Sequence, residues 1–241
     1  GVENELKTLV IADVHLGIEA ELRQKGIHIG SQTAKLLERA VTCVKAVEPD
    51  AIVLLGDVKH AVPNLSFQDR KEVPFFLATL AEYAPVYVVK GNHDGKLKEL
   101  LPAGKHEIYS EGARGFLFDG VGYTHGHSWP SIDLLSASYI LMGHNHPRIR
   151  LTGSHYTGVK SVWIHAKCDY EAVKRQYPEL NDWSDPGVTI MPAFNALCGG
   201  VTFNSPNKRL LGPIATKLLR VEAMVAYLLD GTYIGNVVDL D

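Results

Sequence analysis

Five short clusters of the chain contain side chains that bind metal ions or transfer protons. In order they read A-D-V-H at 12–15, G-D at 56–57, G-N-H-D at 91–94, T-H-G-H at 124–127 and G-H-N-H at 143–146. Most follow a short apolar run, such as L-V-I, V-L-L, Y-V-V or Y-I-L-M. A turn after a strand accepts Asn-Gly or Asp-Gly, but it has no use for an intervening histidine. The repetition of this pattern predicts a common site rather than unrelated turns.

The donor atoms of these clusters indicate the kind of cation that would bind. They are carboxylates, imidazoles and the amide of Asn92, with no cysteine among them. Nitrogen and oxygen donors without sulfur suit manganese, iron, zinc and similar divalent cations, and they do not suggest a structural zinc finger. Taken singly, D-V-H and G-D are more often structural residues than ligands. Taken together, the clusters predict a dinuclear metal site.

The segments that precede the clusters have the composition of buried strands. In the first half of the chain, strands are predicted at Leu6–Ile11, Ala51–Leu55 and Val86–Val89. A helix is predicted over 32–47, with Ser31 as its N-cap. A second helix is predicted over Gln68–Tyr83, with Pro74 near its start or at a kink. This alternation predicts a parallel sheet, whose ligands would bind beyond the carboxyl ends of the strands, where the clusters stand.

The second half of the chain has shorter predicted elements and more β character. Strands are predicted at His106–Tyr109, Gly115–Phe118, Val121–Thr124, Tyr139–Met142, Arg148–Leu151 and Ser161–His165. A helix over Asp169–Tyr177, a loop over Asn181–Gly187 and a hairpin over Ala223–Leu229 and Thr232–Val238 follow. Because no linker or repeat interrupts the chain, residues 1–241 are predicted to form a single domain. The predicted fold class is α/β (α+β by some schemes), a four-layer αββα sandwich of two mixed β-sheets flanked by helices.

Composition excludes several classes of protein. With 46% hydrophobic and 21% charged residues, the 241-residue chain has the composition of a folded globular protein. Its net charge of −3 gives no overall signature of a nucleic-acid-binding domain. Three widely spaced cysteines argue for a reducing, cytoplasmic compartment and against a disulfide framework. The first residues lack the pattern of a signal peptide, and no apolar run is long enough for a membrane span.

The series D-V-H, G-D, G-N-H-D, T-H and G-H-N-H resembles the five motif blocks of the calcineurin-like metallophosphoesterases. Within that superfamily the chain looks most similar to the ICC-like phosphoesterases, which are relatives of the SbcD-type repair nucleases. That branch includes the PdeM-type enzymes associated with DNA ligase and helicase genes. The segments D-V-H-L-G-I-E-A-E-L-R-Q-K-G-I, G-D-V-K-H and P-A-F-N-A-L-C-G-G carry this narrower resemblance. The resemblance implies a metallophosphoesterase fold and a metal-dependent phosphoesterase, which is a hydrolase acting on ester bonds.

The resemblance also implies a role for each residue of the blocks. Asp13, His15 and His146 would hold one metal ion, and Asn92, His125 and His144 would hold the second, with Asp57 bridging both. His93 would be the acid that is not a ligand, and Asp94 would orient it. A metal-bridging hydroxide would then attack phosphorus in line. Two divalent cations are expected, manganese first, with iron, zinc, nickel and magnesium as alternatives.

The second block departs from the family pattern. Many members have G-D-x-x-D-R there, whereas this chain reads G-D-V-K-H. The missing arginine removes one expected phosphate contact, which Lys59 or His60 could replace. His60 and His127 could contact the substrate. Equally, each could support a metal ligand from behind or lie on the protein surface. Arg148 is a further candidate, because it follows the last metal block directly.

The leading hypothesis is a dinuclear phosphodiesterase, specifically a nuclease that acts on single-stranded DNA or flexible DNA ends in DNA repair. The alternatives are a small-molecule phosphatase or cyclic-nucleotide phosphodiesterase and, less favoured, a non-catalytic scaffold for protein binding. Expected partners are a phosphodiester substrate, DNA included, and, by the resemblance, DNA ligase and helicase. No membrane partner is expected. The sequence leaves the oligomeric state open, with a homodimer among the alternatives.

Overall fold

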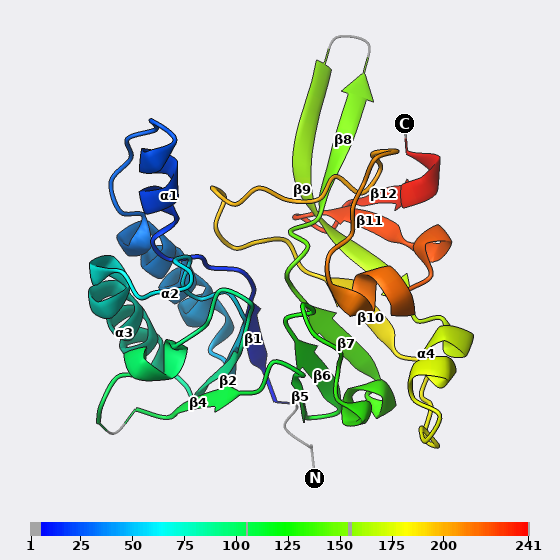
Figure 1. The fold of residues 1–241 in the computed structure, drawn as a ribbon, viewed down its shortest axis with the longest axis horizontal. Helices are drawn as coiled ribbons and strands as arrows, with labels where there is room; N and C mark the ends of the chain where they lie inside the picture. Colours follow the sequence, from blue (N-terminus) through cyan, green and yellow to red (C-terminus); the bar gives the residue numbers. More distant parts are fainter. Residues whose placement is uncertain (1–5, 105, 154–155, 241) are drawn as a thin grey trace.

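Two β-sheets packed face to face form the centre of the molecule. We describe a computed structural model, which covers residues 6–104, 106–153 and 156–240 (Figure 1). The first sheet has the order β1-β2-β3-β4 and is parallel throughout. The second has the order β12-β11-β9-β10-β7-β6-β5, with β8 paired to β9, and it mixes parallel and antiparallel neighbours.

The strands of the first sheet are β1 (Thr8–Ile11), β2 (Ala51–Leu55), β3 (Val86–Val89) and β4 (Ile108–Glu111). Those of the second are β5 (Phe116–Phe118), β6 (Val121–Thr124), β7 (Tyr139–Met142), β8 (Arg148–Gly153), β9 (Tyr156–Lys167), β10 (Gly187–Ile190), β11 (Val225–Leu228) and β12 (Tyr233–Asn236). The α-helices are α1 (Ile18–Gln24), α2 (Thr33–Val47), α3 (Phe67–Ala81) and α4 (Tyr170–Gln176).

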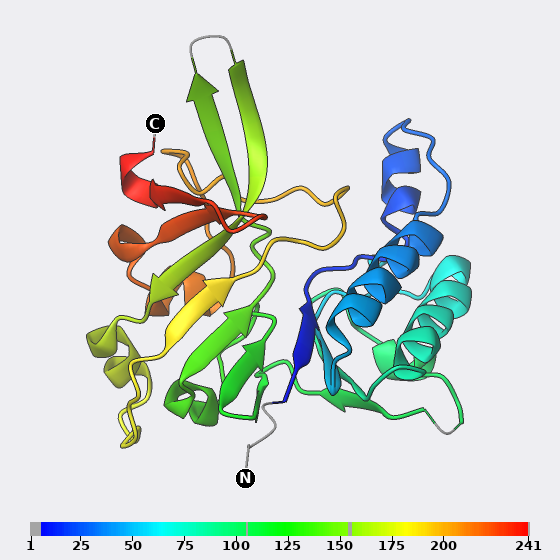
Figure 2. The same cartoon turned by 180° about the vertical axis from the view of Figure 1, so that it is seen from behind.

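Helices cover the outer faces of both sheets. The core between the first sheet and its helices contains Ile52 and Leu54 of β2 with Leu37 of α2 and Phe76 of α3. The second sheet packs its outer face against α4 and the helical turn Ile214–Leu218. Figures 1 and 2 show these layers from the front and from behind. The predicted αββα sandwich is confirmed, although only the second sheet is mixed.

A smaller core joins the two sheets. It contains Val53 and Leu55 of β2, Val89 of β3, Tyr123 of β6 and Met191 after β10, all of them buried. Strand β2 is therefore covered on both faces, and all of its residues are buried. This double burial explains why β2 reads as the uninterrupted apolar run A-I-V-L-L rather than as an alternating strand.

The sheets bring the five polar clusters to one region. Each cluster begins at or just beyond the carboxyl end of a strand: β1, β2 and β3 of the first sheet, and β6 and β7 of the second. Because β1, β2 and β3 are parallel to one another, and β6 is parallel to β7, the clusters of each sheet lie at one edge. The contact between β2 and β6 places these two edges side by side.

Several elements differ from the prediction. Helix α1 and strand β10 were not predicted; α1 has only 7 residues and no side-chain cap, and β10 begins at the end of the predicted loop. Helix α3 begins after Ser66, whose side chain forms a capping box with Asp69, and Pro74 lies well inside the helix rather than near its start. Helix α2 has Gln32, not Ser31, at its N-cap.

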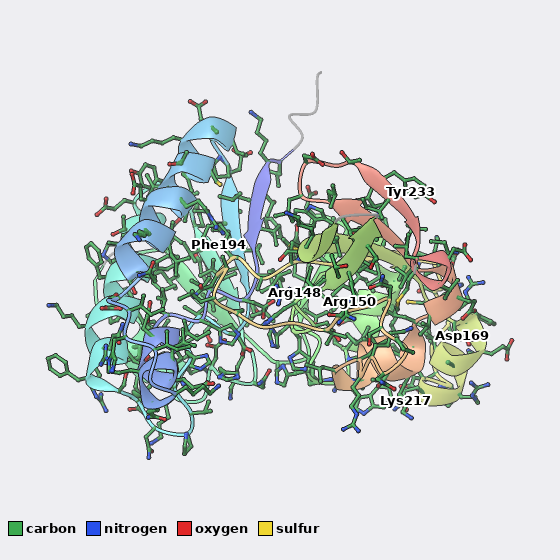
Figure 3. The ribbon with its side chains drawn as sticks, turned by 90° about the horizontal axis from the view of Figure 1, so that it is seen from above. Arg148, Arg150, Asp169, Phe194, Lys217 and Tyr233 are labelled. Carbon is green, nitrogen blue, oxygen red and sulfur yellow. The ribbon has the colours of Figure 1, made fainter. Side chains whose placement is uncertain are left out.

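The longest strand leaves the sheet as a projecting hairpin. The inner part of β9 pairs with β10 and β11, whereas its outer part pairs with β8 alone. Figures 1 and 2 show the β8–β9 hairpin extending beyond the rest of the second sheet. Arg148 and Arg150, both labelled in Figure 3, lie on β8 at the end of the hairpin nearer the sheet, where they pair with Ser161 and Val159 of β9. Among the residues that the structure describes, no helix has the length and apolarity needed to cross a membrane.

Candidate metal centre

The residues at the strand ends have an unusual backbone conformation. Of the nine non-glycine residues with positive φ in the described chain, five belong to the predicted ligand set, namely Asp13, His15, Asp57, His144 and His146. The left-handed region is unfavourable for residues with a side chain, and it persists where surrounding structure enforces it, often at functional sites. Here it turns the chain sharply at the ends of β1, β2 and β7, so that neighbouring side chains face the same small volume.

The first donor set consists of Asp13, His15, His146 and Asp57. The Nε2 atom of His146 lies 3.2 Å from Asp13 Oδ1, and the Nε2 atom of His15 lies 3.5 Å from Asp57 Oδ2. Both Nε2 atoms are buried and make no hydrogen bond. A buried polar atom without a partner is costly in a folded protein, and a cation between these nitrogens and carboxylates would satisfy both. The donor set therefore fits a divalent metal ion.

The second donor set consists of Asp57, Asn92, His125 and His144. The Nε2 atom of His125 lies 3.1 Å from Asn92 Oδ1 and 3.3 Å from Asp57 Oδ2. Donor atoms of Asp57, His125 and His144 all lie within 4.8 Å of one another. Two imidazoles, a carboxylate and an amide oxygen again fit a divalent cation such as manganese, iron or zinc.

Asp57 stands between the two sets. Its Oδ2 faces His15 on one side and His125 on the other, while its Oδ1 accepts a hydrogen bond from the backbone N–H of His93, at 2.8 Å. A Cβ atom on Gly91 would come within 2.1 Å of Oδ1, so only glycine allows this close approach. The backbone thus fixes the carboxylate between the two donor sets.

Burial and neighbouring charges separate the histidines into two protonation classes. Burial, only partly opposed by Asp57, lowers the pKa of His15 to about 3. Burial and the charge of His125 lower the pKa of His144 to about 3. Burial alone would also lower the pKa of His125, but the hydrogen bond and charge of Asp57, together with Asp13, raise it to about 9. Without a cation, a proton on His125 therefore balances part of the buried negative charge.

The position of Asp94 corrects the prediction that it orients the His93 ring. Its Oδ1 accepts hydrogen bonds from the backbone N–H groups of Val58 and Lys59, at 3.0 and 3.3 Å, and its Oδ2 accepts one from Gly91, at 2.9 Å. The carboxylate is almost fully buried and joins two loops of the site. The ring of His93 is held instead by the backbone carbonyl of His60, 2.6 Å from His93 Nδ1. Adjacent residues on a sharp turn point in different directions, which is why the sequence neighbour is not the partner.

Lys59 is also not the phosphate contact that the second block suggested. Its side chain is fully buried, and its ammonium group donates to the backbone carbonyls of Ala61 and His93. Burial lowers the pKa of Lys59, while Asp69 and Asp94 oppose that shift. A buried lysine with these partners supports the loop that carries His93 and cannot reach a substrate.

His60 lies between Glu21 and His15, which is one of the predicted metal ligands. Its Nε2 lies 2.6 Å from Glu21 Oε2 on α1, and its Nδ1 lies 3.1 Å from Nδ1 of His15. One proton arrangement satisfies both contacts: His60 Nε2–H donates to Glu21, and His15 Nδ1–H donates to His60. These two hydrogen bonds, here called the Glu21–His60–His15 relay, leave Nε2 of His15 free to bind a cation.

A cleft of about 630 Å³ opens over both donor sets. His60 and His93 line it, as do His15, Asn92, His144 and His146. The other substrate-binding candidates lie outside this cleft. His127 is packed beside the rings of His125 and His144. Arg148 borders two smaller cavities, one beside the β8–β9 hairpin and one that His146 and Cys198 also line. Arg148 therefore lies next to the first donor set, although it does not line the cleft itself.

The segment 191–201, which crosses from the second sheet to the first, supplies contacts that the motif analysis missed. Its Asn195 donates from Nδ2 to the backbone carbonyl of Val14, at 2.9 Å, and the Gly199 carbonyl accepts from Nδ1 of His146, at 2.9 Å. Phe194, labelled in Figure 3, lies under the guanidinium of Arg39 on α2, 3.6 Å from the ring centre. The only sequence signal was the stretch P-A-F-N-A-L-C-G-G, which carries no ligand pattern of its own.

Comparison with known proteins supports the resemblance. Residues 6–189 match the family described as calcineurin-like phosphoesterase. Among solved structures, the nuclease MPE of Pseudomonas putida is similar over 92% of this chain and 84% of its own, with a TM-score of 0.52 and 20% sequence identity. Yfce, a phosphoesterase from E. coli, is similar over 95% and 97%, with a TM-score of 0.45 and 14% identity. The family match spans most of the chain, and the likeness to the nuclease supports the fold.

Replacing Asp94 with alanine tests its position as a bridge between loops. The change leaves three buried backbone N–H groups without acceptors, which we expect to lower the free energy of unfolding by about 3 kcal/mol or more. Urea unfolding of the metal-free protein would measure the loss. An Asp94→Ala protein of unchanged stability and reduced turnover would instead favour the orienting role predicted from the sequence.

The pKa of His125 predicts that cation affinity at the second donor set increases with pH. A cation must displace the proton that Asp57 and Asp13 hold on this ring up to about pH 9. Affinity should rise by about tenfold per pH unit from ~6 and level off above ~9. In the metal-free protein the same raised pKa stabilises the fold below the ordinary value of 6.5, and this contribution is lost as the pH rises through about 9.

Calorimetric titration in two buffers of different ionisation enthalpy would count the protons released. About one proton at neutral pH is expected for this donor set. A cation affinity that is constant from pH 6 to 9, with no proton release, would contradict this electrostatic account.

The Glu21–His60–His15 relay predicts that a surface carboxylate affects metal affinity. Glu21→Gln removes the charge that fixes the His60 proton, and we expect it to weaken cation binding at the first donor set by about 10–100-fold. Lys25→Met is the matched control, because Lys25 pairs with the other oxygen of Glu21 and does not contact His60. Histidine ¹⁵N spectra would show the tautomers of His15 and His60 directly. Equal affinities in both variants, with unchanged tautomers, would exclude the relay.

Proposed function

The chain belongs to the calcineurin-like phosphoesterase family, a family of metal-dependent hydrolases, and we propose that it is a dinuclear phosphodiesterase that cleaves single-stranded DNA or flexible DNA ends. The observation that carries the dinuclear part is the position of Asp57. One carboxylate oxygen faces a donor set on each side, and the buried Nε2 atoms of His15 and His146 make no hydrogen bond. Two cations, manganese by first expectation, would satisfy all of these atoms.

The donor sets divide between the cations as follows. Asp13, His15 and His146 would hold the first, Asn92, His125 and His144 the second, and Asp57 would contact both. When bound, such a pair of cations lowers the pKa of water and neutralises negative charge on a phosphoryl group. The remaining side chains of the cleft then have to place the substrate and supply a proton to the leaving group.

His93 is the residue placed to move that proton. Both Asn92 and His93 of the G-N-H-D cluster line the cleft. Asn92 belongs to the second donor set, whereas His93 belongs to neither set. The His60 carbonyl accepts from its Nδ1–H, so in the imidazolium form the proton on Nε2 is the one that can pass to a departing alkoxide oxygen. The backbone of His93 is held on both sides. Its N–H donates to Asp57, and its carbonyl accepts from the ammonium group of Lys59. A fixed imidazole at this position suits general acid catalysis.

The lining of the cleft favours a short, flexible substrate. Apolar side chains flank the donor sets, from α1 on one side and from the 197–211 segment on the other: Ile18, Leu22, Leu197, Val201 and Leu211. Lys25 is the only lysine or arginine that the structure places in the lining, and it pairs with Glu21. A duplex requires a longer row of phosphate contacts than this. Apolar walls beside the cations would instead contact the bases of an unpaired strand end.

The DNA substrate agrees with the narrower sequence resemblance to the repair-linked branch, and a protein of similar fold is named a nuclease. The size of the cleft also favours a second candidate, a cyclic-nucleotide phosphodiesterase or small-molecule phosphatase, because about 630 Å³ is within the range of small-ligand sites. A cytoplasmic location, a single domain, a homodimer and association with DNA ligase and helicase stay predictions.

Three variants test the assigned roles in hydrolysis of bis-p-nitrophenyl phosphate with added manganese. Asp57→Asn and His144→Ala should lose activity together with bound metal, because asparagine replaces the shared carboxylate by an uncharged amide and alanine offers no donor. His93→Ala should keep its metal and lower kcat by about 10²–10⁴-fold, the usual contribution of a general acid. His106→Ala, at an exposed histidine before β4, is the control and should equal the wild type. Full activity in Asp57→Asn would overturn the assignment.

A substrate panel separates the two candidate functions. The panel would contain single-stranded DNA, duplex DNA with and without unpaired ends, RNA and cyclic nucleotides. The proposal predicts cleavage of single strands and of unpaired ends, with intact duplex left uncut. Exclusive hydrolysis of cyclic nucleotides or monoesters would favour the small-substrate candidate and contradict the nuclease.

A further inference from the structure

We propose that Cys198 is a sulfur ligand of the first cation, beside Asp13, His15 and His146, and that it makes this position prefer zinc or iron(II) over magnesium or manganese. The inference rests on the proposed metal site and adds to it a donor of another chemical class. It concerns the segment 191–201, which none of the five motif clusters includes.

The distances place the thiol within reach of the first donor set. The Sγ atom of Cys198 and one ring nitrogen each of His15 and His146 all lie within 4.8 Å of one another. Two donors on the same zinc ion, one sulfur and one nitrogen, stand at most about 4.4 Å apart, since the bonds are about 2.3 and 2.1 Å. The group therefore needs only a small side-chain adjustment to surround one cation.

Backbone contacts hold Cys198 in this position from both sides. Asn195 donates from Nδ2 to the carbonyl of Val14, at 2.9 Å, and to that of His15, at 3.4 Å. The carbonyl of Gly199 accepts from Nδ1 of His146, at 2.9 Å. Cys198 lies between these two anchors, and its own N–H donates to the Asn195 carbonyl, at 3.1 Å. The same contacts that orient the two histidines thus fix the cysteine relative to them.

A second observation points to a ligand at this place. The Nε2 atoms of His15 and His146 are both buried and have no hydrogen-bond partner. His15 as a whole is only 3% exposed, so water does not readily replace the missing partner. Those atoms belong to the histidines with which the thiol is grouped. Zinc and iron(II) both bind to sites that combine carboxylate, imidazole and thiolate ligands, and these three kinds of donor surround one point here.

Binding would convert the thiol to a thiolate. As the bond between Sγ and the cation forms, the S–H proton leaves to solvent, and no oxidant or reductant takes part. Thiolate is a soft donor that favours zinc and iron(II), whereas magnesium and manganese prefer oxygen ligands. With Cys198 the two cation positions would differ in chemistry, because the second donor set contains only nitrogen and oxygen.

Cobalt substitution tests the proposal with a readout other than activity. The reduced, metal-free protein would be titrated with two equivalents of Co²⁺, as wild type, Cys198→Ser, Cys198→Ala and Cys43→Ser. Cys43 is the matched control, since it lies on α2 and belongs to neither donor set. Wild type and Cys43→Ser should show a thiolate-to-cobalt charge-transfer band in the near ultraviolet. Both Cys198 variants should lack this band and keep the visible ligand-field bands.

Metal competition gives an independent measure of selectivity. Cys198→Ser should weaken zinc binding at the first position by about tenfold or more, with a much smaller change for manganese. Ligand-field bands without a charge-transfer band in wild type would overturn the role of Cys198 and leave the proposed metal site intact. No cobalt binding in any of the proteins would overturn both, so the two failures are distinguishable.

Discussion

Two carboxylates withdrawn from water at the junction of the two sheets impose the main constraint on this structure. Asp13 and Asp57 are 0% and 2% exposed. A buried carboxylate is very unfavourable unless positive charge or hydrogen-bond donors compensate it. Hydrogen bonds to His125 and to the backbone of His93, acting against burial, hold the pKa of Asp57 below its ordinary range. Several features supply this compensation: the surrounding histidines, the left-handed turns that direct them inward, and Gly91, which lets the backbone come close to Asp57. Divalent cations would balance the buried negative charge more completely.

A second regularity concerns how the imidazoles are held. Three of them place Nδ1 against a backbone carbonyl: His125 against Leu55, His146 against Gly199 and His93 against His60. Because a carbonyl only accepts, each contact fixes the proton on Nδ1 and leaves Nε2 available to the site. His15 reaches the same state through the side chain of His60. The site therefore depends on backbone positions as much as on the ligand side chains.

This dependence explains what the sequence could and could not predict. The strands before the five clusters and the convergence of their ends follow from local patterns and from the parallel order of β1, β2 and β3. The contact of Glu21 with His60 spans 39 residues, and that of Asn195 with the His15 carbonyl spans 180, so no local pattern contains them. Asp94 misled in the opposite way, because the family resemblance implied that it orients the adjacent His93 ring, and the turn does not allow that contact. Cys198 lay outside the five motif clusters and enters the site only through the fold.

The proposed chemistry requires two cations that share the Asp57 carboxylate. The most direct measurement is anomalous diffraction from crystals of the manganese-loaded protein. Shared binding by Asp57 predicts two anomalous peaks, one beside Asp13, His15 and His146 and the other beside Asn92, His125 and His144, with the Asp57 carboxylate between them. A single peak, or peaks away from Asp57, would contradict it.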